Sequence, residues 1–476
     1  MRVSACLNWT RTVFEWGKEM RNHIFDGIMG LCVADVLGVP VEFNSREKLK
    51  VNPVTDMRAY GTHNQPYGTL SDDTSMTLCL LDSLYCGLDY QDVMEKFKAW
   101  LTEGKYTPHG EVFDVGVGTR QAIMRYVSGV APLQCGGVGE RDNGNGSLMR
   151  ILPLLFYIQS LYGTDFQDVD EAFDMIHQAS ALTHAHKRSQ IACGIYLSVA
   201  SMLIGNMNLS IAVELGIYKA FEYYKGKPEY EAEISHYHRL SDKNFGEINE
   251  VEIRSSGYVV DTLEAAIWCL INSKTYKDCV LMAVNLGDDT DTVAAVAGGL
   301  AGLYYGSENI PIEWTAKIVR KDYIEELSER LHRSLAKRSI DKLLAFIPYF
   351  ENANEKNACS WGGGEKLGEN HFSMPYPIYE QTLEDFIQAV YSSNLICYNY
   401  LEVIEKHGLH GTEEMNTAIE ESDLELTLAI LTGYIRQERF CDGLWESAVK
   451  DKTFLKMLRR LERLTYAAKC IDEGGV

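Results

Sequence analysis

The stretch Val284-Asn285-Leu286-Gly287-Asp288-Asp289-Thr290-Asp291-Thr292-Val293-Ala294-Ala295 places acidic and hydroxyl side chains between an apolar helix and a helix rich in Ala and Gly. Each interior glycine costs about 1 kcal/mol relative to alanine, so this composition predicts close packing against another element. Buried carboxylates need a counter-charge, which a divalent cation would supply. An Asp/Thr helix N-cap with surplus surface charge is the alternative.

A second acidic loop has the same character. Gly68-Thr69-Leu70-Ser71-Asp72-Asp73-Thr74 precedes a helical stripe formed by Met76, Leu80 and Leu84. Both loops therefore place carboxylates and a hydroxyl at the start of a buried helix. Oxygen donors without nearby Cys or His favour Mg²⁺ or Mn²⁺ over Zn²⁺. Two such loops would be able to hold two metals roughly 4 Å apart.

Ser71-Asp72-Asp73-Thr74 and Gly287-Asp288-Asp289-Thr290-Asp291-Thr292 together resemble the paired metal motifs of the ADP-ribosylglycohydrolase family. That family includes the dinitrogenase-reductase-activating glycohydrolases and the animal ADP-ribosyl-acceptor hydrolases. Ser71 stands where many members have Thr, and Asp288 where Gly is commoner. The resemblance implies two Mg²⁺ (or Mn²⁺) ions with these ligands: Ser71, Asp72, Asp73, Asp289, Asp291 and Thr292.

Two further carboxylates match motifs of the same family. Gly30 to Glu42 is similar to G-x-x-x-G-D-x-L-G-x-P-x-E, with Ala34 in place of the second Gly. Asp114 opens a D-x-G-x-x-T element. The resemblance implies that Glu42 and Asp114 are the catalytic, proton-transferring residues. From the residues alone, Glu42 would be an exposed loop carboxylate and Asp114 a helix N-cap.

Glycine-rich and aromatic segments match the family's ligand-binding elements. The loop 136–150 is rich in glycine and enters a helix, which brings backbone N–H groups near an anion, although it is neither a P-loop nor a dinucleotide fingerprint. From the residues alone, His184 would be a capping or buried histidine and Tyr258 would be a core residue. The resemblance implies that ADP-ribose is bound by Gly116, Asn145, Gly146, Ser147, Met149, His184, Gly257 and Tyr258.

The implied activity is metal-dependent hydrolysis of the glycosidic bond between ADP-ribose and an acceptor, either a protein side chain or a small molecule. A non-catalytic ADP-ribose-binding protein and a metal-dependent phosphohydrolase of a nucleotide are the alternatives. The motifs leave the leaving group open. Arginine, serine, a nucleobase or an acyl group would present the same ADP-ribose half.

Composition limits the class of protein. The formal net charge of −22 argues against broad nucleic-acid binding. The 12 cysteines have no C-x-x-C spacing, which predicts buried thiols in a reducing cytoplasm. The N-terminus lacks a signal-type apolar segment, and we expect no membrane span because no uninterrupted run of 18 apolar residues occurs. Residues 1–19 are expected to be a dispensable extension or a start-site artefact.

The helical period of the segments predicts an all-α protein. We expect one large domain over residues 21–349, which the resemblance makes an orthogonal helical bundle of the ADP-ribosylglycohydrolase type. A polar, Gly-rich linker is predicted over 350–375 and a smaller helical module of unknown function over 376–470. The module has no paired catalytic residues, which favours a role in binding a protein partner.

Overall fold

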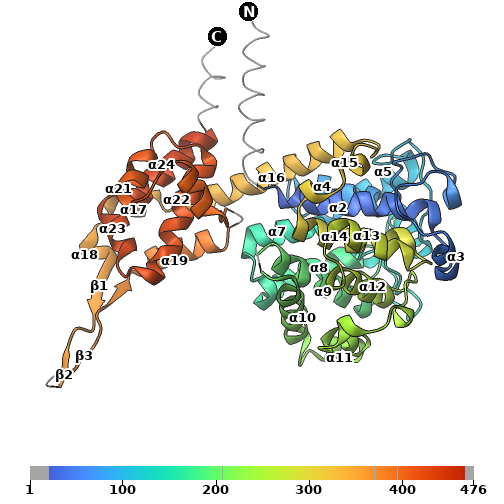
Figure 1. Ribbon diagram of the computed structural model, residues 1–476, viewed down its shortest axis with the longest axis horizontal. Helices are drawn as coiled ribbons and strands as arrows, with labels where there is room; N and C mark the ends of the chain where they lie inside the picture. Colours follow the sequence, from blue (N-terminus) through green and yellow to red (C-terminus); the bar gives the residue numbers. More distant parts are fainter. Residues whose placement is uncertain (1–20, 206, 369–370, 394, 467–476) are drawn as a thin grey trace, which may run out of the picture. The chain divides into compact units, whose positions relative to one another are not determined.

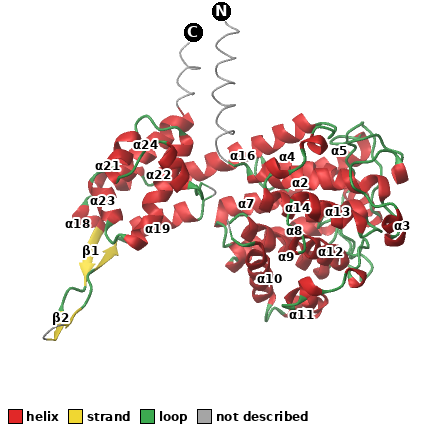
Figure 2. Cartoon of the chain, viewed as in Figure 1, coloured by secondary structure: helices red, strands yellow, loops and turns green. Residues whose placement is uncertain are grey.

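The computed structural model describes residues 21–205, 207–368, 371–393 and 395–466 of the chain. The prediction about residues 1–19 lies outside these ranges. The chain divides into two compact units, a first unit over Asn22–His332 and a second that includes the chain from Arg333 onward. The point of division falls within helix α16 (Lys321–Leu344). The described part is predominantly helical, as predicted, and its strands form two short two-stranded sheets in the second unit (Figure 2).

The first unit is built of α-helices joined by short 3₁₀ turns (Figure 1). The helices are α2 His23–Gly38, α3 Arg46–Val51, α4 Asp72–Leu84, α5 Tyr90–Glu103, α6 Val117–Val127, α7 Leu152–Tyr162, α8 Asp170–Ala181, α9 Lys187–Leu203, α10 Leu209–Tyr224, α11 Pro228–Ile234, α12 Val259–Ile271, α13 Tyr276–Asn285, α14 Thr290–Tyr305 and α15 Ile312–Thr315. The 3₁₀ turns are η1 Val39–Val41, η2 Gly61–His63, η3 Pro132–Gln134, η4 Phe166–Asp168, η5 Ser235–Ser241, η6 Phe245–Glu247, η7 Glu250–Glu252 and η8 Ser307–Asn309.

The centre of the first unit is the contact between α2 and α14, which α4, α12 and α13 surround. The helices touch through glycine: a Cβ on Gly30 would lie 2.4 Å from the carbonyl oxygen of Gly298, and one on Gly302 would lie 2.2 Å from that of Asp26. The close packing predicted from the small residues is confirmed. It brings the C-terminal end of α2 against the N-terminal end of α14, where the second acidic loop begins.

Helix α2 bears on the expectation that no segment spans a membrane. With its 3₁₀ extension, the segment His23–Val41 is long and apolar enough to cross a membrane by length and composition, although Asp26 and Asp35 interrupt the apolar run. In the structure 94% of the most apolar window is buried. The burial is that of a core helix packed on its neighbours.

The cysteines differ in part from expectation. The ten described cysteines are free thiols, and six of them are buried. Cys86 and Cys441 are exposed, so the prediction that the thiols are buried is wrong at these positions. Both lie at the ends of helices, where the chain turns into solvent.

The second unit has its own hydrophobic core. Its elements after α16 are α17 Ile347–Asn352, α18 Glu355–Ala358, β1 Cys359–Gly362, β2 Lys366–Gly368, β3 His371–Phe372, β4 Tyr376–Tyr379, α19 Gln381–Tyr391, α20 Tyr400–Lys406, α21 Thr412–Ala418, α22 Leu424–Gln437, η9 Glu438–Phe440, α23 Leu444–Lys450 and α24 Thr453–Tyr466. The segment predicted as a linker over 350–375 therefore contains α18, β1 and the antiparallel β2–β3 pair, and β4, the partner of β1, begins just after it.

Candidate active site

The first acidic loop caps helix α4. Ser71 is the N-cap residue: its hydroxyl accepts a hydrogen bond from the Asp73 N–H at 3.2 Å and donates one to Asp73 Oδ2 at 3.0 Å. Asp35 of α2 accepts from the backbone N–H groups of Ser71 and Thr74 at 3.1 and 3.3 Å. The Asp35 carboxylate therefore holds the first acidic loop against the central helix α2.

The second acidic loop is held by backbone contacts. The Asp289 N–H donates to the Ser255 carbonyl at 3.0 Å, and the Thr290 hydroxyl donates to the Gly38 carbonyl at 2.8 Å. A Cβ on Gly38 would lie 2.4 Å from the Asp291 backbone, so only glycine fits there. The two acidic loops meet directly, because the Thr292 hydroxyl donates to Asp73 Oδ2 at 3.3 Å.

The two loops and the end of α2 create a cluster of buried carboxylates. One oxygen from each of Asp35, Asp73 and Asp291 lies within 4.8 Å of the others, as does one from each of Glu42, Asp289 and Asp291. Burial raises the pKa of Asp35 to about 6, and burial together with the neighbouring carboxylates raises the pKa of Asp73 and Asp291 well above the usual range.

The donor chemistry of this cluster fits a hard divalent cation. Asp73 Oδ1, Asp289 Oδ1 and Asp291 Oδ2 are buried and have no hydrogen-bond partner among the described residues. An unpaired buried carboxylate oxygen costs free energy that a cation ligated by oxygen would recover. The carboxylates of Asp73, Asp289 and Asp291 are therefore brought together with those of Asp35 and Glu42. Ser71 and Thr292 adjoin them through hydrogen bonds to Asp73, whereas Asp72 belongs to neither group.

A histidine links the two predicted proton-transfer residues. His63, in the short turn η2, hydrogen-bonds through Nε2 to Glu42 and lies 4.0 Å from Asp114 Oδ2. Glu42 is 5% exposed, so its reading as an exposed loop carboxylate is wrong. Burial raises the pKa of Glu42 to about 8 although the hydrogen bond from His63 lowers it. The same hydrogen bond raises the pKa of His63.

The glycine-rich loop is bound to the second acidic loop. The Asn145 side-chain amide donates to Asp289 Oδ2 at 2.8 Å and to the Thr262 hydroxyl at 3.0 Å. Its backbone N–H donates to the Gly257 carbonyl at 3.1 Å. A Cβ on Gly257 would lie 3.0 Å from Asp289, so Gly257 adjoins the carboxylate cluster. Tyr258 follows and pairs with Gly144 through the backbone.

His184 lies under the glycine-rich loop. Cβ atoms on Gly118 and Gly144 would each lie 3.3 Å from its Nε2, and its Nδ1 hydrogen-bonds to the Thr183 hydroxyl at 2.8 Å. Burial, with the charge of Arg150, lowers the pKa of His184 to about 3. The imidazole is therefore neutral and acts as a hydrogen-bonding group.

Three predicted ligand-binding residues are placed differently from the rest. Ser147 is fully buried, and its hydroxyl accepts a hydrogen bond from the Ser180 hydroxyl at 2.9 Å. Met149 is buried beside α4, where its carbonyl accepts from Thr77 at 3.4 Å. Gly116 is the exposed N-cap of α6.

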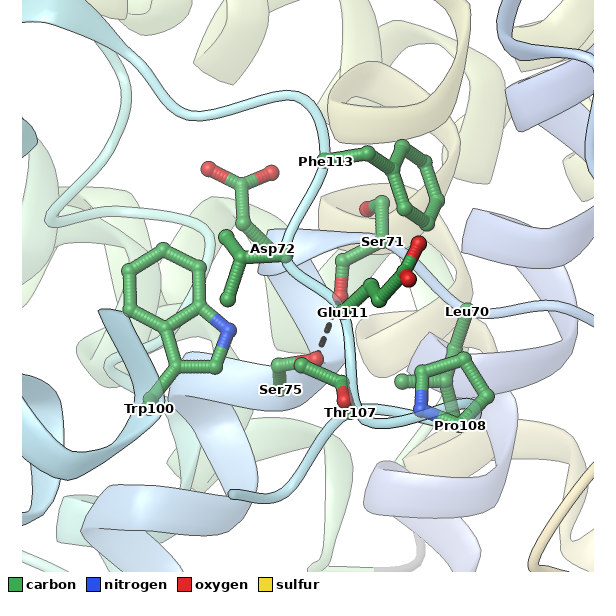
Figure 3. A pocket seen from close by; sticks show the side chains of 10 residues that line it. Leu70, Ser71, Asp72, Ser75, Trp100, Thr107, Pro108, Glu111 and Phe113 are labelled. Carbon is green, nitrogen blue, oxygen red and sulfur yellow. Dashed lines mark hydrogen bonds between the residues drawn. The ribbon is translucent and has the colours of Figure 1, made fainter. Parts of the chain in front are cut away.

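Figure 3 shows a small pocket on the side of the first acidic loop, where the Ser75 hydroxyl donates to the Ser71 carbonyl at 2.8 Å. Its lining is Leu70, Ser71, Asp72, Ser75, Trp100, Thr107, Pro108, Glu111, Val112 and Phe113. Asp72 therefore faces both acidic and aromatic neighbours, and burial and the charges of Asp114 and Asp35 raise its pKa.

The sequence did not identify His63 as a site residue. His63 is flanked by Thr62 and Asn64 in a polar loop and matches no motif. The feature that points to His63 is the turn at Gly61, which has φ +59°. A Cβ on Gly61 would lie 1.8 Å from the Pro40 carbonyl oxygen, so this turn packs against the loop that carries Glu42.

Comparisons with known proteins find relatives of both parts of the chain. Residues 17–340 match the model of the ADP-ribosylglycohydrolase family, and residues 335–467 match a family of unknown function (DUF6508). The chain is 32% identical to the ADP-ribosylarginine hydrolase Tri1 of Serratia proteamaculans, over 64% of this chain and 77% of the relative. It is 30% identical to the ADP-ribosyl-[dinitrogen reductase] glycohydrolase of Rhodospirillum rubrum, over 69% and 98%.

A solved structure shares the fold. It is titled ADP-ribosylglycohydrolase-related protein complex and matches with a TM-score of 0.54 and 29% identity, over 67% of this chain and 99% of the other. The matched chain is covered almost completely, so the whole fold of the relative is present here.

Proposed function

Since the chain belongs to the ADP-ribosylglycohydrolase family, whose model matches residues 17–340, we propose that it hydrolyses the bond between ADP-ribose and the guanidinium of arginine in a modified protein. The relatives named as an ADP-ribosylarginine hydrolase and a dinitrogen reductase glycohydrolase support this substrate class. The observation that carries the proposal is the cluster in which Glu42, Asp289 and Asp291 each offer an oxygen within 4.8 Å.

We assign the carboxylate cluster to two Mg²⁺ or Mn²⁺ ions. When bound, these ions supply electrostatic attraction for ribose hydroxyl oxygens and for a water at the anomeric carbon. The proposed ligands are Ser71, Asp72, Asp73, Asp289, Asp291 and Thr292, with Asp35 and Glu42 close enough to contribute. The orphaned oxygens of Asp73, Asp289 and Asp291 support this assignment.

Proton transfer is assigned to Glu42 and Asp114. As the glycosidic bond breaks, the anomeric carbon gains positive charge, which nearby carboxylates stabilise. Glu42 is buried beside the acidic cluster and hydrogen-bonded by His63, and it is the proposed donor of a proton to the departing nitrogen. His63, which contacts both carboxylates, keeps them oriented.

The remaining part of ADP-ribose is assigned to the glycine-rich loop and its neighbours. The contributing groups are Gly116, Asn145, Gly146, the backbone of Ser147, Met149, His184, Gly257 and Tyr258. The Asn145–Asp289 hydrogen bond would couple this region to the metal ligands. Cytoplasmic location is proposed from the free thiols of the described cysteines. A protein-binding role for the second unit stays a prediction.

Mass spectrometry of products from arginine-linked, serine-linked and O-acetyl ADP-ribose conjugates tests the proposal, with Mg²⁺ and with EDTA. Metal-dependent release of intact ADP-ribose from the arginine conjugate is the expected result. Binding of ADP-ribose without any product would instead indicate a binding protein. Release of AMP would indicate cleavage of the diphosphate by a phosphohydrolase.

A further inference from the structure

Three rings form a row beside the two proton-transfer carboxylates. The ring of His63 lies 6.0 Å from that of Phe43 and 5.3 Å from that of Phe113, measured between centroids. Phe43 directly follows Glu42, and Phe113 directly precedes Asp114. Each proposed catalytic carboxylate is therefore adjacent in sequence to a phenylalanine. His63 contacts a ring of each pair, Glu42–Phe43 and Phe113–Asp114. We call Phe43, His63 and Phe113 the aromatic row.

The backbone that presents this row is strained on both sides. Phe43 has φ +61° and Asp114 has φ +48°, in the left-handed region that non-glycine residues rarely occupy. The Phe43 N–H donates to the Asp288 carbonyl at 2.7 Å, and the Asp288 N–H donates to the Asn44 carbonyl at 2.9 Å. These two bonds hold the loop in its strained form. They also give Asp288 a structural role through its backbone.

The Phe43 side chain is 68% exposed. Backbone strain at non-glycine residues collects at ligand-binding and catalytic sites, and here it holds a large exposed apolar ring beside Glu42. The ring stands next to Glu42, whose carboxylate reaches the cluster of Asp289 and Asp291. Phe43 is thus exposed at the edge of the reaction centre.

The chemistry of the row selects one kind of ligand. Aromatic faces attract cations, and the planar guanidinium group stacks on them better than an ammonium does. The adjoining carboxylate of Asp114, whose Oδ2 lies 4.0 Å from His63, adds attraction for positive charge and repels anions. A hydroxyl or acyl leaving group would gain neither interaction.

We propose that the aromatic row is the acceptor subsite and binds the planar cationic side chain from which ADP-ribose is removed. This rests on the proposed function for its position beside the scissile bond. Phe43 is the specificity-determining residue, because its ring is the exposed member of the row.

The variants Phe43→Leu and Phe43→Trp distinguish the effect of an aromatic face from that of apolar volume, because Leu removes the aromatic face and Trp keeps it. Both side chains meet the same left-handed backbone, so the strain at this position is unchanged. Phe440→Leu is the matched control, because Phe440 is 79% exposed and belongs to the second unit. Thermal unfolding of each variant checks that the fold is intact.

The first measurement is binding of agmatine, a free guanidinium compound, by saturation-transfer NMR in the presence of ADP-ribose and Mg²⁺. Phe43→Leu is expected to weaken agmatine binding about 2- to 30-fold, the range of a cation–π contact, while Phe43→Trp and Phe440→Leu retain it. Equal agmatine binding by the wild type and Phe43→Leu would overturn the subsite.

The second measurement compares kcat/KM for arginine-linked and O-acetyl conjugates. Phe43→Leu should lower the arginine value by a similar factor and leave the O-acetyl value and the ADP-ribose Kd unchanged. Equal losses for both conjugates would overturn the inference. If the wild type cleaves no conjugate but binds agmatine through Phe43, the proposed function fails and the subsite stands.

Discussion

The imidazole of His63 hydrogen-bonds through Nε2 to the carboxylate of Glu42, which is itself buried beside the acidic cluster. The Thr62 hydroxyl adds a second bond to the same loop, donating to the Glu42 carbonyl at 2.7 Å. The turn Gly61–His63 therefore fixes the position of the Glu42 carboxylate.

Replacing this support should slow the reaction without removing the binding site. For His63→Gln we expect turnover to fall at least about tenfold, because a misplaced acid–base group loses part of its typical 10²–10⁴-fold contribution. Steady-state kinetics with the arginine conjugate measure the loss, and calorimetry should show an unchanged ADP-ribose Kd. His23→Gln, at the start of α2, is the control. An equal loss in both variants would contradict the role of His63.

Removing one carboxylate from each acidic loop should abolish the metal-dependent reaction. In the double variant Asp72→Asn, Asp291→Asn we expect no turnover above background, because both loops lose a ligand. The metal-free protein should be at least as stable as the wild type, since mutual repulsion between buried carboxylates is relieved. Thermal unfolding in EDTA and product analysis in Mg²⁺ check both parts. Full activity would refute the metal site.

The metal-free protein should lose stability as pH rises. The pKa of Glu42 is raised from 4.5 to about 8, so the folded protein holds a proton that the unfolded chain releases between these values. The pKa of His63 is raised above 6.5, so its contribution is present below that pH and is lost above it. Thermal unfolding in EDTA between pH 5 and pH 9 measures the slope, which Glu42→Gln should flatten. A rising curve would contradict these shifts.

Enlarging a glycine at the central helix contact should destabilise the first unit and its site together. A Cβ on Gly298 would lie 2.4 Å from that of Ala34 and 2.5 Å from the Gly30 carbonyl oxygen. For Gly298→Ala we expect a loss of about 1–3 kcal/mol, the range for overpacking a tight core. Urea unfolding measures this loss. Gly411→Ala is the control, because nothing lies within 4 Å of its Cβ, and a comparable loss there would contradict the explanation.

Local patterns in the sequence were sufficient for most of the first unit. The predicted stripe of Met76, Leu80 and Leu84 lies in α4, and the predicted helix rich in Ala and Gly is α14. Both acidic loops begin buried helices, as predicted from their caps and stripes. These features depend on spacing within one segment, which periodicity and capping residues report directly.

Contacts between distant segments could not be read in the same way. Asp35 reaches the N-terminus of α4, and His63 reaches Glu42 across a loop, because tertiary packing decides both. The strands β1, β2 and β3 in the segment predicted as a linker were missed as well, since none is longer than four residues. The direction of the buried Ser147 hydroxyl likewise depends on Ser180, a residue on another helix.

The contact between α2 and α14 also determines when the first unit can fold during synthesis. Ribosomes release the chain in the direction from the N-terminus to the C-terminus, so α2 emerges before its partner Gly298 and the second acidic loop, which follow only when the first unit is nearly complete. Until then, an apolar helix of membrane-spanning length lacks the surface that covers it. A truncation before Ala294 therefore leaves α2 without the partner that covers it, and its exposed apolar surface favours aggregation. The site can assemble only after almost the entire first unit has been translated.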